Sequence, residues 1–379
     1  MSTSGGILVQ KGIHRQSKEG LCVASVGSPL QEHHLTVQPL PGESLGQMIQ
    51  RLAMALKELN ATVVRHEVFG SVTAKEETFQ LMREKFGRVD WPVMWIGSTA
   101  STPRGVSGMH VFAVTGLDVD TVSLNGLPIG RVFTNGTTRH CLLSDIRPSN
   151  PSASRSVQYR EVFENIGCTL SEAGMGLADV ARAWFFLDGI LTGYDSFNEI
   201  RNNFYRQKGI FEGVIPASTG VGGRNPANAA LTAAVWAISD SDGLTKVRDV
   251  PSPLQCSSVG YGSAFSRAVL VTEPNCRRLF VSGTASIGPN GQSLHQGNVK
   301  EQISLTMKVV QTLLKENRFT FGDVARATAY FKNVADVSAF DAWRTKHGMQ
   351  SMPVVAVQAD ICRDELLFEV ELDAISRGI

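Results

Sequence analysis

The stretch DVARATAYF at residues 323–331 decides the fold, because two similar stretches precede it in the chain. Residues 179–186 read DVARAWFF, and residues 62–69 read TVVRHEVF. Around each stretch, apolar residues at spacings of four and three predict a helix before it, and a second helix containing Phe follows it. A short strand opens each set and two apolar strands close it. The sequence therefore predicts three copies of one unit with the order β-α-β-α-β-β.

This element order predicts an α+β fold in which two helices cover one face of each unit's sheet. Three such sheets can enclose a common core, which hides the sheet edges and leaves grooves where the units meet. We predict an amino-terminal extension at residues 1–32 and units at residues 33–117, 118–240 and 241–379. Candidate sites are expected in the grooves between units.

Composition excludes several classes of protein. The 379 residues are 42% apolar and 19% charged, and 36 Lys and Arg against 35 Asp and Glu give a net charge of +1. The charges are scattered, whereas nucleic-acid binding needs a basic stripe. No apolar run approaches the ~20 residues that span a bilayer. Six dispersed cysteines and the lack of a leader pattern predict a cytoplasmic protein without disulfides.

Three acids alternate along the last predicted strand. Glu369, Glu371 and Asp373 are separated by single apolar residues, so all three side chains point to one face. Charged residues are mostly exposed, which favours a solvated face for Glu371 and Asp373. Glu369 lies between Phe368 and Val370, and two interpretations stay open for it. It is either exposed, or a carboxylic acid in an apolar groove whose raised pKa suits a general acid.

A glycine-rich segment and a recurring arginine are further candidates. Residues 216–224 read PASTGVGGR, which either forms a tight bend or binds a carboxylate through its amides and Arg224. Arg65, Arg182 and Arg326 recur at one position of the three units, which favours a structural role. The histidines have no metal-ligand spacing, so no metal site is predicted.

The third unit carries a family resemblance. The stretches LFVSGTA (279–285), GDVARATAY (322–330) and FEVE (368–371) resemble the RidA/YjgF superfamily. The resemblance implies the chorismate-mutase-like fold of that superfamily, whose members are usually trimers with ligand sites between subunits. Three units in one chain would then form an intramolecular pseudo-trimer, and the protein is expected to be a monomer. The imine deaminases of the superfamily hold a substrate carboxylate with an arginine, which none of the three units offers at the matching strand.

Two stretches are similar to the chorismatases, IPASTGVG (215–222) and DICRDELLFEVE (360–371). The resemblance implies that Glu369 is the catalytic acid, which protonates the enolpyruvyl methylene of chorismate and releases pyruvate. Gly283 and Cys362 occupy positions that separate the subtypes and imply the 3-hydroxybenzoate-forming type. No cofactor is implied.

We therefore expect one working groove between the second and third units, with Glu369 as the catalytic residue. The predicted substrate-binding residues are Gly283, Cys362, Arg363, Ser218, Thr219, Gly220, Arg224 and Tyr205. The expected partner is a small substrate bearing carboxylates, with no nucleic acid and no membrane. Two alternatives stay open. One is an imine or enamine deaminase, or another hydrolase of a small carboxylate, of the RidA type. The other is a small-ligand-binding protein without catalysis.

Overall fold

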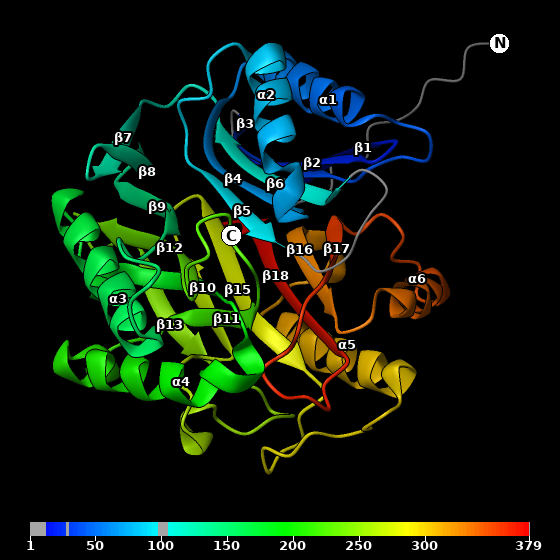
Figure 1. Ribbon diagram of the computed structural model, residues 1–379. Coiled ribbons are helices and arrows are strands. Elements are labelled where there is room, and N and C mark those ends of the chain that lie inside the picture. The colour runs from blue at the N-terminus through cyan, green and yellow to red at the C-terminus, as the bar shows by residue number, and fades with distance from the viewer. Residues whose placement is uncertain (1–12, 28–29, 98–104, 379) are drawn as a thin grey trace.

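The computed structural model describes residues 13–27, 30–97 and 105–378, and these form three similar units (Figure 1). Each unit contains one six-stranded sheet. In each sheet one neighbouring pair of strands is parallel and the other pairs are antiparallel. The three sheets face one another, and the helices lie outside them.

The elements of the units follow the same order. Unit 1 comprises β1 His14–Lys18, β2 Leu21–Gly27, β3 Leu30–Val37, α1 Leu45–Glu58, β4 Thr62–Gly70, α2 Lys75–Phe86, β5 Val93–Gly97 and β6 Val106–Val114. Unit 2 comprises β7 Val119–Leu124, β8 Leu127–Asn135, β9 Thr138–Ile146, α3 Arg155–Glu172, β10 Val180–Leu187, α4 Ile190–Gln207, β11 Ala217–Gly222 and β12 Leu231–Asp240. Unit 3 comprises β13 Lys246–Val250, β14 Ala268–Thr272, β15 Cys276–Ala285, α5 Val299–Glu316, β16 Val324–Phe331, α6 Val337–Lys346, β17 Val354–Gln358 and β18 Phe368–Arg377.

Short 3-10 turns connect some of these elements, at Val72–Ala74, Leu177–Asp179, Ile210–Glu212, Val259–Tyr261, Phe321–Asp323 and Val334–Asp336. The strand orders are β1-β2-β3-β6-β4-β5, β11-β10-β12-β9-β8-β7 and β13-β14-β15-β18-β16-β17. These orders describe one topology three times. The chain is therefore an intramolecular pseudo-trimer, as predicted.

The predicted element order was incomplete, because three strands, not one, precede the first helix of each unit. In unit 1, β1 and β2 lie within the predicted extension at residues 1–32, yet both belong to the first sheet. The sequence of β1, HRQSK, is almost wholly exposed, so it shows no alternation of apolar and polar residues. An edge strand of polar residues is a common way to protect a sheet edge.

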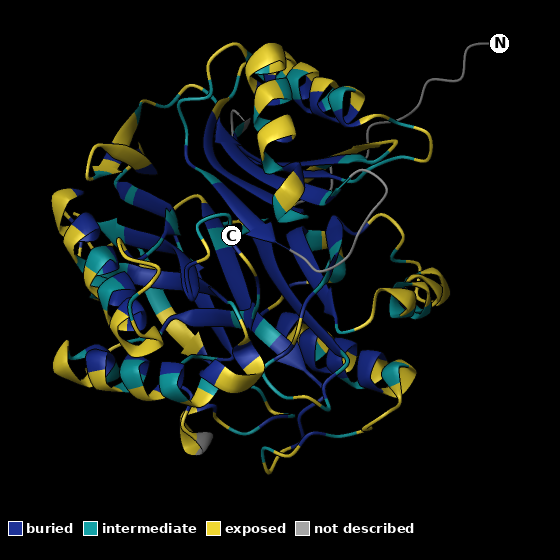
Figure 2. Cartoon of the chain, in the orientation of Figure 1, coloured by how far each residue is buried: buried dark blue, intermediate teal, exposed yellow. Residues whose placement is uncertain are grey.

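Each helix presents an apolar stripe to its own sheet. In α1, buried Met48, Ile49 and Leu52 lie on this stripe. The helix begins at a capping box in which Ser44 accepts from the backbone of Gln47 and the Gln47 side chain accepts from the backbone of Ser44. Figure 2 shows buried strands beneath helices whose outer faces are exposed. No helix in the described parts of the chain has the length and hydropathy of a membrane-crossing segment.

The inner faces of the three sheets pack against one another. The Trp236 ring on β12 lies 5.0 Å from the Phe112 ring on β6 and 5.3 Å from the Phe280 ring on β15, measured between centroids. These aromatic contacts join one strand of each unit within a single apolar cluster. Buried aromatic rings contribute large apolar areas to a core, so the three units are held together at the centre of the molecule.

The strand register aligns the units residue by residue. The recurring arginines Arg65, Arg182 and Arg326 pair with Phe112, Trp236 and Asp373, respectively. Four residues further along each strand, the partners are Gly108 in unit 1, Thr232 in unit 2 and Glu369 in unit 3. The position of Glu369 therefore carries an acid in unit 3 only, as the sequence comparison predicted.

Candidate functional site

A cavity of about 160 Å³ lies at the junction of units 2 and 3. Helix α4 and strand β11 supply one wall, and β15, β18 and three loop segments of unit 3 supply the other. The lining residues are Tyr194, Asp195, Asn198, Arg201, Ser218, Gly220, Ser263, Phe265, Arg267, Gly283, Ala285, Ile287, Cys362, Arg363 and Glu369. This is the groove in which the sequence placed the candidate site.

Most of the predicted site residues meet in this cavity. Those in its wall are Ser218, Gly220, Gly283, Cys362, Arg363 and Glu369. Thr219 lies directly behind the wall, where its hydroxyl accepts a hydrogen bond from the Gly283 amide at 3.1 Å and donates one to Glu371 at 2.7 Å. The glycine-rich segment forms β11 and pairs with β10, so it is a strand and not a bend or an anion-binding loop.

Two predicted binding residues lie outside the cavity. Tyr205 is buried between α4 and its neighbours, where its ring contacts Phe163 and Phe211. Arg224 follows β11 on the surface, with its side chain 66% exposed and 3.8 Å from the Asp188 carboxylate. The chain turns away from the cavity after Gly222, because Arg224 pairs with Gly97 of unit 1.

Glu369 is a neutral acid at neutral pH. Its side chain is 5% exposed, and burial raises its pKa to about 8, with a further upward contribution from the negative charge of Glu371. The positive charges of Arg182 and Arg267 oppose this shift. A carboxyl group that is protonated near neutral pH can donate its proton to a bound molecule. The burial of Glu369 excludes an exposed side chain, but the cavity beside it is lined by polar and charged residues as well as by apolar ones.

Glu371 is ionised, although it lies two residues away on the same strand. Burial alone would raise its pKa, but the charges of Arg326 and Arg182 and the hydrogen bond from Thr219 lower it to about 2. Its carboxylate accepts hydrogen bonds from Arg182, from Trp184 Nε1 at 2.6 Å and from Arg326 at 2.9 Å. Two neighbouring carboxyl groups thus hold opposite protonation states, which is a common arrangement in acid–base sites.

The prediction of a solvated face for Glu371 and Asp373 was wrong. Both side chains are fully buried, and Asp373 accepts a hydrogen bond from Arg326 at 3.1 Å. The alternation of acids along a strand gives the face to which they point, but the residues that cover that face come from other strands and other units. Here Arg65, Arg182 and Arg326 converge over it and form a buried ion network.

The recurring arginines surround one aromatic ring. The guanidinium carbons of Arg65, Arg182 and Arg326 lie 3.6, 4.5 and 5.3 Å from the Trp184 ring centroid. Three carboxylates balance these charges. Glu67 pairs with Arg65 and Arg326. Glu371 pairs with Arg182 and Arg326, and Asp373 pairs with Arg326. The arginines therefore join the three units structurally, and they also set the charge behind the cavity.

The sequence analysis missed two buried cations in the cavity wall. Arg201 of α4 is 2% exposed and donates to the Asn198 side chain at 2.6 Å, and Arg267 donates to the backbone oxygen of Cys256. The Nε of Arg201 and the hydroxyl of Ser218 have no hydrogen-bond partner among the described residues. Buried polar atoms normally have partners, so these two are suited to a polar ligand.

A signal for the missed α4 residues does exist in the sequence. Tyr194, Asn198 and Arg201 are spaced by four and three, which places them on one helix face. Among apolar neighbours such as Phe197 and Phe204, this polar stripe predicts a face turned toward something other than the core. Arg267 has no comparable signal, because it is the last residue of an irregular segment before β14.

Comparisons with known proteins agree with this architecture. The sequence profile of the Endoribonuclease L-PSP family matches residues 262–376, which is most of unit 3. The crystal structure of a chorismatase matches with a TM-score of 0.61 at 18% identity, covering 83% of this chain and 93% of that one. The family match is confined to unit 3, where it agrees with the predicted resemblance to the RidA/YjgF superfamily. At this level of identity, the likeness to the chorismatase is one of fold.

Two further similar proteins match only part of this chain. A RutC family protein of Pyrococcus abyssi is 27% identical over 94 residues, which is 24% of this chain and 74% of that protein. The structure of a putative endoribonuclease L-PSP from Entamoeba histolytica has a TM-score of 0.30 at 21% identity, and covers 34% of this chain and 98% of that one.

Gly283 leaves room for the acid of this site. A Cβ added at position 283 would overlap the Oε1 atom of Glu369, and would also come within 3.3 Å of Thr219. The neighbouring Cys362 stays a thiol, because burial and the Glu369 carboxylate raise its pKa to about 12. The two positions that the resemblance assigns to subtype choice therefore flank the catalytic candidate.

A second buried cluster lies where all three units meet. Glu32, His140 and Glu273 are close enough together to hold a metal ion. However, the Arg278 guanidinium donates to Glu32 at 2.7 Å and to Glu273 at 2.6 Å, and already provides the positive charge that the carboxylates need. The cluster is best described as a buried ion group that joins the units.

Proposed function

We propose that this chain converts chorismate to a hydroxybenzoate and pyruvate, with 3-hydroxybenzoate as the product that the resemblance favours. One observation carries the proposal. A buried carboxylic acid with a pKa of about 8 lies in a cavity that also contains buried arginines, on a fold shared with a chorismatase. We further propose that the protein acts as a cytoplasmic monomer, since the units close on one another within one chain.

The charges of the cavity suit this substrate. Chorismate carries two carboxylates and a ring, so its site needs cations and an apolar surface. Arg201, Arg267 and Arg363 line the cavity, while Phe265 and Ile287 provide apolar contacts. Oriented guanidinium groups in a site that excludes water stabilise anions more strongly than they do in bulk water.

The proposed reaction starts with proton transfer from Glu369. The proton goes to the methylene carbon of the enolpyruvyl group, which becomes the methyl group of pyruvate, while positive charge develops at the adjoining ether carbon. Cleavage of the ether bond to the ring then releases pyruvate. As that bond breaks, the oxygen of the neighbouring ring hydroxyl attacks the carbon that loses the ether oxygen and forms an epoxide, while the hydroxyl proton goes to the Glu369 carboxylate. The epoxide then opens so that its oxygen stays on that carbon, and loss of the hydrogen from the same carbon gives 3-hydroxybenzoate. Chorismate has the summed atoms of hydroxybenzoate and pyruvate, so no net redox change occurs.

The experiment that tests this function is incubation of the purified protein with chorismate. Chromatography should detect pyruvate and hydroxybenzoate in equal amounts. Absence of both products from a folded protein would contradict the proposal. Release of ammonia from imines generated in the same assay would instead support the deaminase alternative. If neither reaction occurs but a small carboxylate binds in the cavity, the ligand-binding alternative is supported.

The rate is expected to depend on the protonation of Glu369. Because burial raises its pKa to about 8, kcat should be constant below that value and fall roughly tenfold per pH unit above it. Glu371 stays ionised throughout this range because its pKa is about 2. A pH profile of kcat from about pH 6 to about pH 10 checks this, with circular dichroism to confirm folding. A rate that rises with pH over this range would contradict the assignment of an acid.

The substitution Gly283→Ala is expected to lower kcat by about 10²-fold, since it displaces the Glu369 carboxylate by the width of a methyl group. The clash is with the end of a flexible side chain, so the fold should be retained. Gly46→Ala is a matched control, because an added Cβ there meets only Leu81 at an ordinary 3.5 Å. Steady-state kinetics on both variants is the measurement. Unchanged turnover in Gly283→Ala would show that the glycine is not needed.

A further inference from the structure

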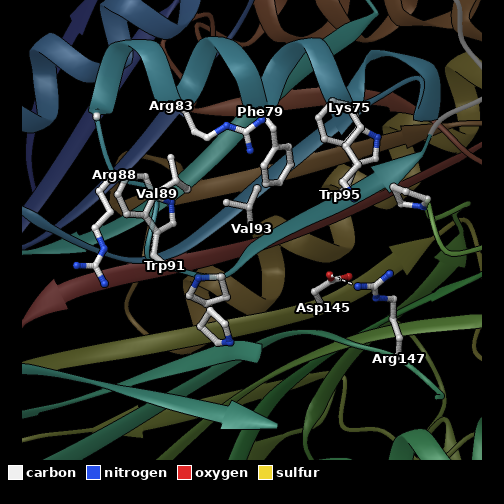
Figure 3. Close-up of a pocket in the computed structure, with 14 residues that line it drawn as sticks. Lys75, Phe79, Arg83, Arg88, Val89, Trp91, Val93, Trp95, Asp145 and Arg147 are labelled. Carbon is white, nitrogen blue, oxygen red and sulfur yellow. Dashed lines mark ion pairs between the residues drawn. The ribbon is translucent and has the colours of Figure 1, made fainter. Parts of the chain in front are cut away.

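A larger groove lies at the junction of units 1 and 2 and has a volume of about 560 Å³ (Figure 3). Its lining residues are Lys75, Phe79, Arg83, Gly87, Arg88, Val89, Trp91, Pro92, Val93, Trp95, Pro128, Asp145, Arg147 and Pro226. Helix α2 and strand β5 supply one side, and the end of β9 supplies the other. The cavity of the proposed reaction does not share any of these residues.

The strand register shows that this groove corresponds to the cavity between units 2 and 3. Val93 pairs with the residue after Arg65, as Ser218 pairs with the residue after Arg182. By the same register Trp95 takes the place of Gly220. The cavity between units 2 and 3 therefore has Ser218 and Gly220 at these positions. The groove between units 1 and 2 has Val93 and the indole ring of Trp95 instead.

The acid of the second groove comes from a different strand. In unit 3 the register shifts at Ser282 and Gly283, and in unit 2 it shifts in the same way at Ser144 and Asp145. Asp145 thus occupies the position of Gly283. In unit 3 the carboxylate of Glu369 fills the space beside Gly283. In unit 2 the residue equivalent to Glu369 is Thr232. The exchange means that the carboxyl group at this junction comes from β18 in one groove and from β9 in the other.

Asp145 faces a cationic groove. Its side chain is 23% exposed, and its carboxylate lies 3.0 Å from the Arg147 guanidinium (Figure 3). Burial raises its pKa to about 6, against the positive charges of Arg147 and Lys75. These two groups, one from the end of its own strand and one from α2, are the charged neighbours that act on it. Asp145 has a left-handed backbone, which aspartate tolerates better than most residues.

Two cations and three aromatic rings line the rest of the groove. Lys75 and Arg83 form no salt bridge with any described residue, whereas Arg88 pairs with Asp90. The rings are those of Phe79, Trp91 and Trp95. Trp95 is 2% exposed, yet its indole N–H has no hydrogen-bond partner in the described parts of the chain. The groove therefore presents positive charge beside apolar rings.

We propose that the groove between units 1 and 2 binds a small planar aromatic carboxylate, with Lys75 and Arg83 attracting the anion and Phe79, Trp91 and Trp95 contacting its ring. The volume of about 560 Å³ is within the range of small-molecule sites. The site is one of binding, and it does not depend on the reaction proposed for the other cavity.

Isothermal titration calorimetry with benzoate as the probe tests this site. The double substitution Lys75→Glu and Arg83→Glu should weaken binding at least tenfold, because it replaces attraction by repulsion on an accessible helix face. Lys308→Glu on the exposed side of α5 is the matched control and should bind like the wild type. Benzyl alcohol, which lacks the charge, should bind at least tenfold more weakly than benzoate.

Two further variants separate this site from the first cavity. Glu369→Gln should lose turnover in the cavity between units 2 and 3 but retain benzoate binding in the groove between units 1 and 2. The second site can therefore be measured even when the reaction is absent. Asp145→Asn should bind benzoate equally at all pH values, whereas wild-type affinity should fall as pH rises through about 6, since ionised Asp145 repels the anion. Equal binding by the wild type and the Lys75 and Arg83 double variant would overturn the proposal. So would a complete loss of binding in Glu369→Gln.

Discussion

Glu369→Gln is expected to lower kcat for chorismate by about 10²–10⁴-fold, which is the usual contribution of a general acid. The amide has nearly the shape of the protonated carboxyl group and is also neutral. Because Glu369 is itself neutral below a pKa of about 8, the substitution should leave the folded state almost unchanged near neutral pH. The loss should therefore fall on the chemical step, with little change in KM.

The measurement is a steady-state comparison with Glu316→Gln, which makes the same chemical change at the exposed end of α5. The residual activity of Glu369→Gln should no longer fall above pH 8, because the titrating group has been removed. Wild-type turnover by this variant would exclude Glu369 as the proton donor and direct attention to the other polar groups of the cavity.

Glu371→Ala is expected to destabilise the protein by about 3–5 kcal/mol, which is typical of removing one partner from a buried ion network. The Glu371 carboxylate is fully buried and accepts hydrogen bonds from Arg182, Arg326 and Trp184. Without it, two guanidinium groups from different units lose a common counter-charge. The effect should therefore weaken the contact between units 2 and 3.

Urea unfolding measures this loss, and an exposed ion pair provides the control. Asp341→Ala breaks the pair with Arg344, whose acid is half exposed, and should cost no more than about 1 kcal/mol. The Glu371 contribution should also depend on pH. Because its folded pKa of about 2 lies below the ordinary 4.5, the stabilisation is present above 4.5 and is lost as pH falls toward 2. Destabilisation by Glu371→Ala as small as in the control would contradict the network.

The repeated stretches allowed most of the fold to be predicted. The arginine-bearing strand and the apolar spacing of its flanking helices recur in all units, because each unit must bury the same faces. The first hairpin of unit 1 could not be found in this way. Its outer strand, β1, is an exposed edge with polar residues, so the alternation that marks a half-buried strand is missing.

The candidate site was predictable where a residue's own neighbours reveal its surroundings. Glu369 between Phe368 and Val370 is such a case, whereas the burial of Glu371 depends on Arg182 of unit 2 and on Arg326 of a neighbouring strand, both far away in the sequence. Arg224 was misleading, because a glycine-rich segment next to an arginine can be a strand that turns outward. Glycine-rich anion loops and edge strands share the same composition.

The correspondence of Asp145 and Gly283 could not be seen in the sequence at all. It depends on matching register shifts in the ladders of β9 and β15, and such shifts are set by the pairing of strands and not by their composition. The same register explains why two grooves of one pseudo-trimer differ in chemistry. Small changes at equivalent positions alter which strand supplies the acid.

The most direct test of the central claim is an infrared titration of Glu369. The difference spectrum between wild type and Glu369→Gln isolates the carbonyl band of the protonated Glu369 carboxyl group. The account predicts that this band is present at neutral pH and disappears with a pKa of about 8. Loss of the band near the ordinary value of 4.5 would mean that Glu369 is ionised at neutral pH, and would contradict its role as the acid.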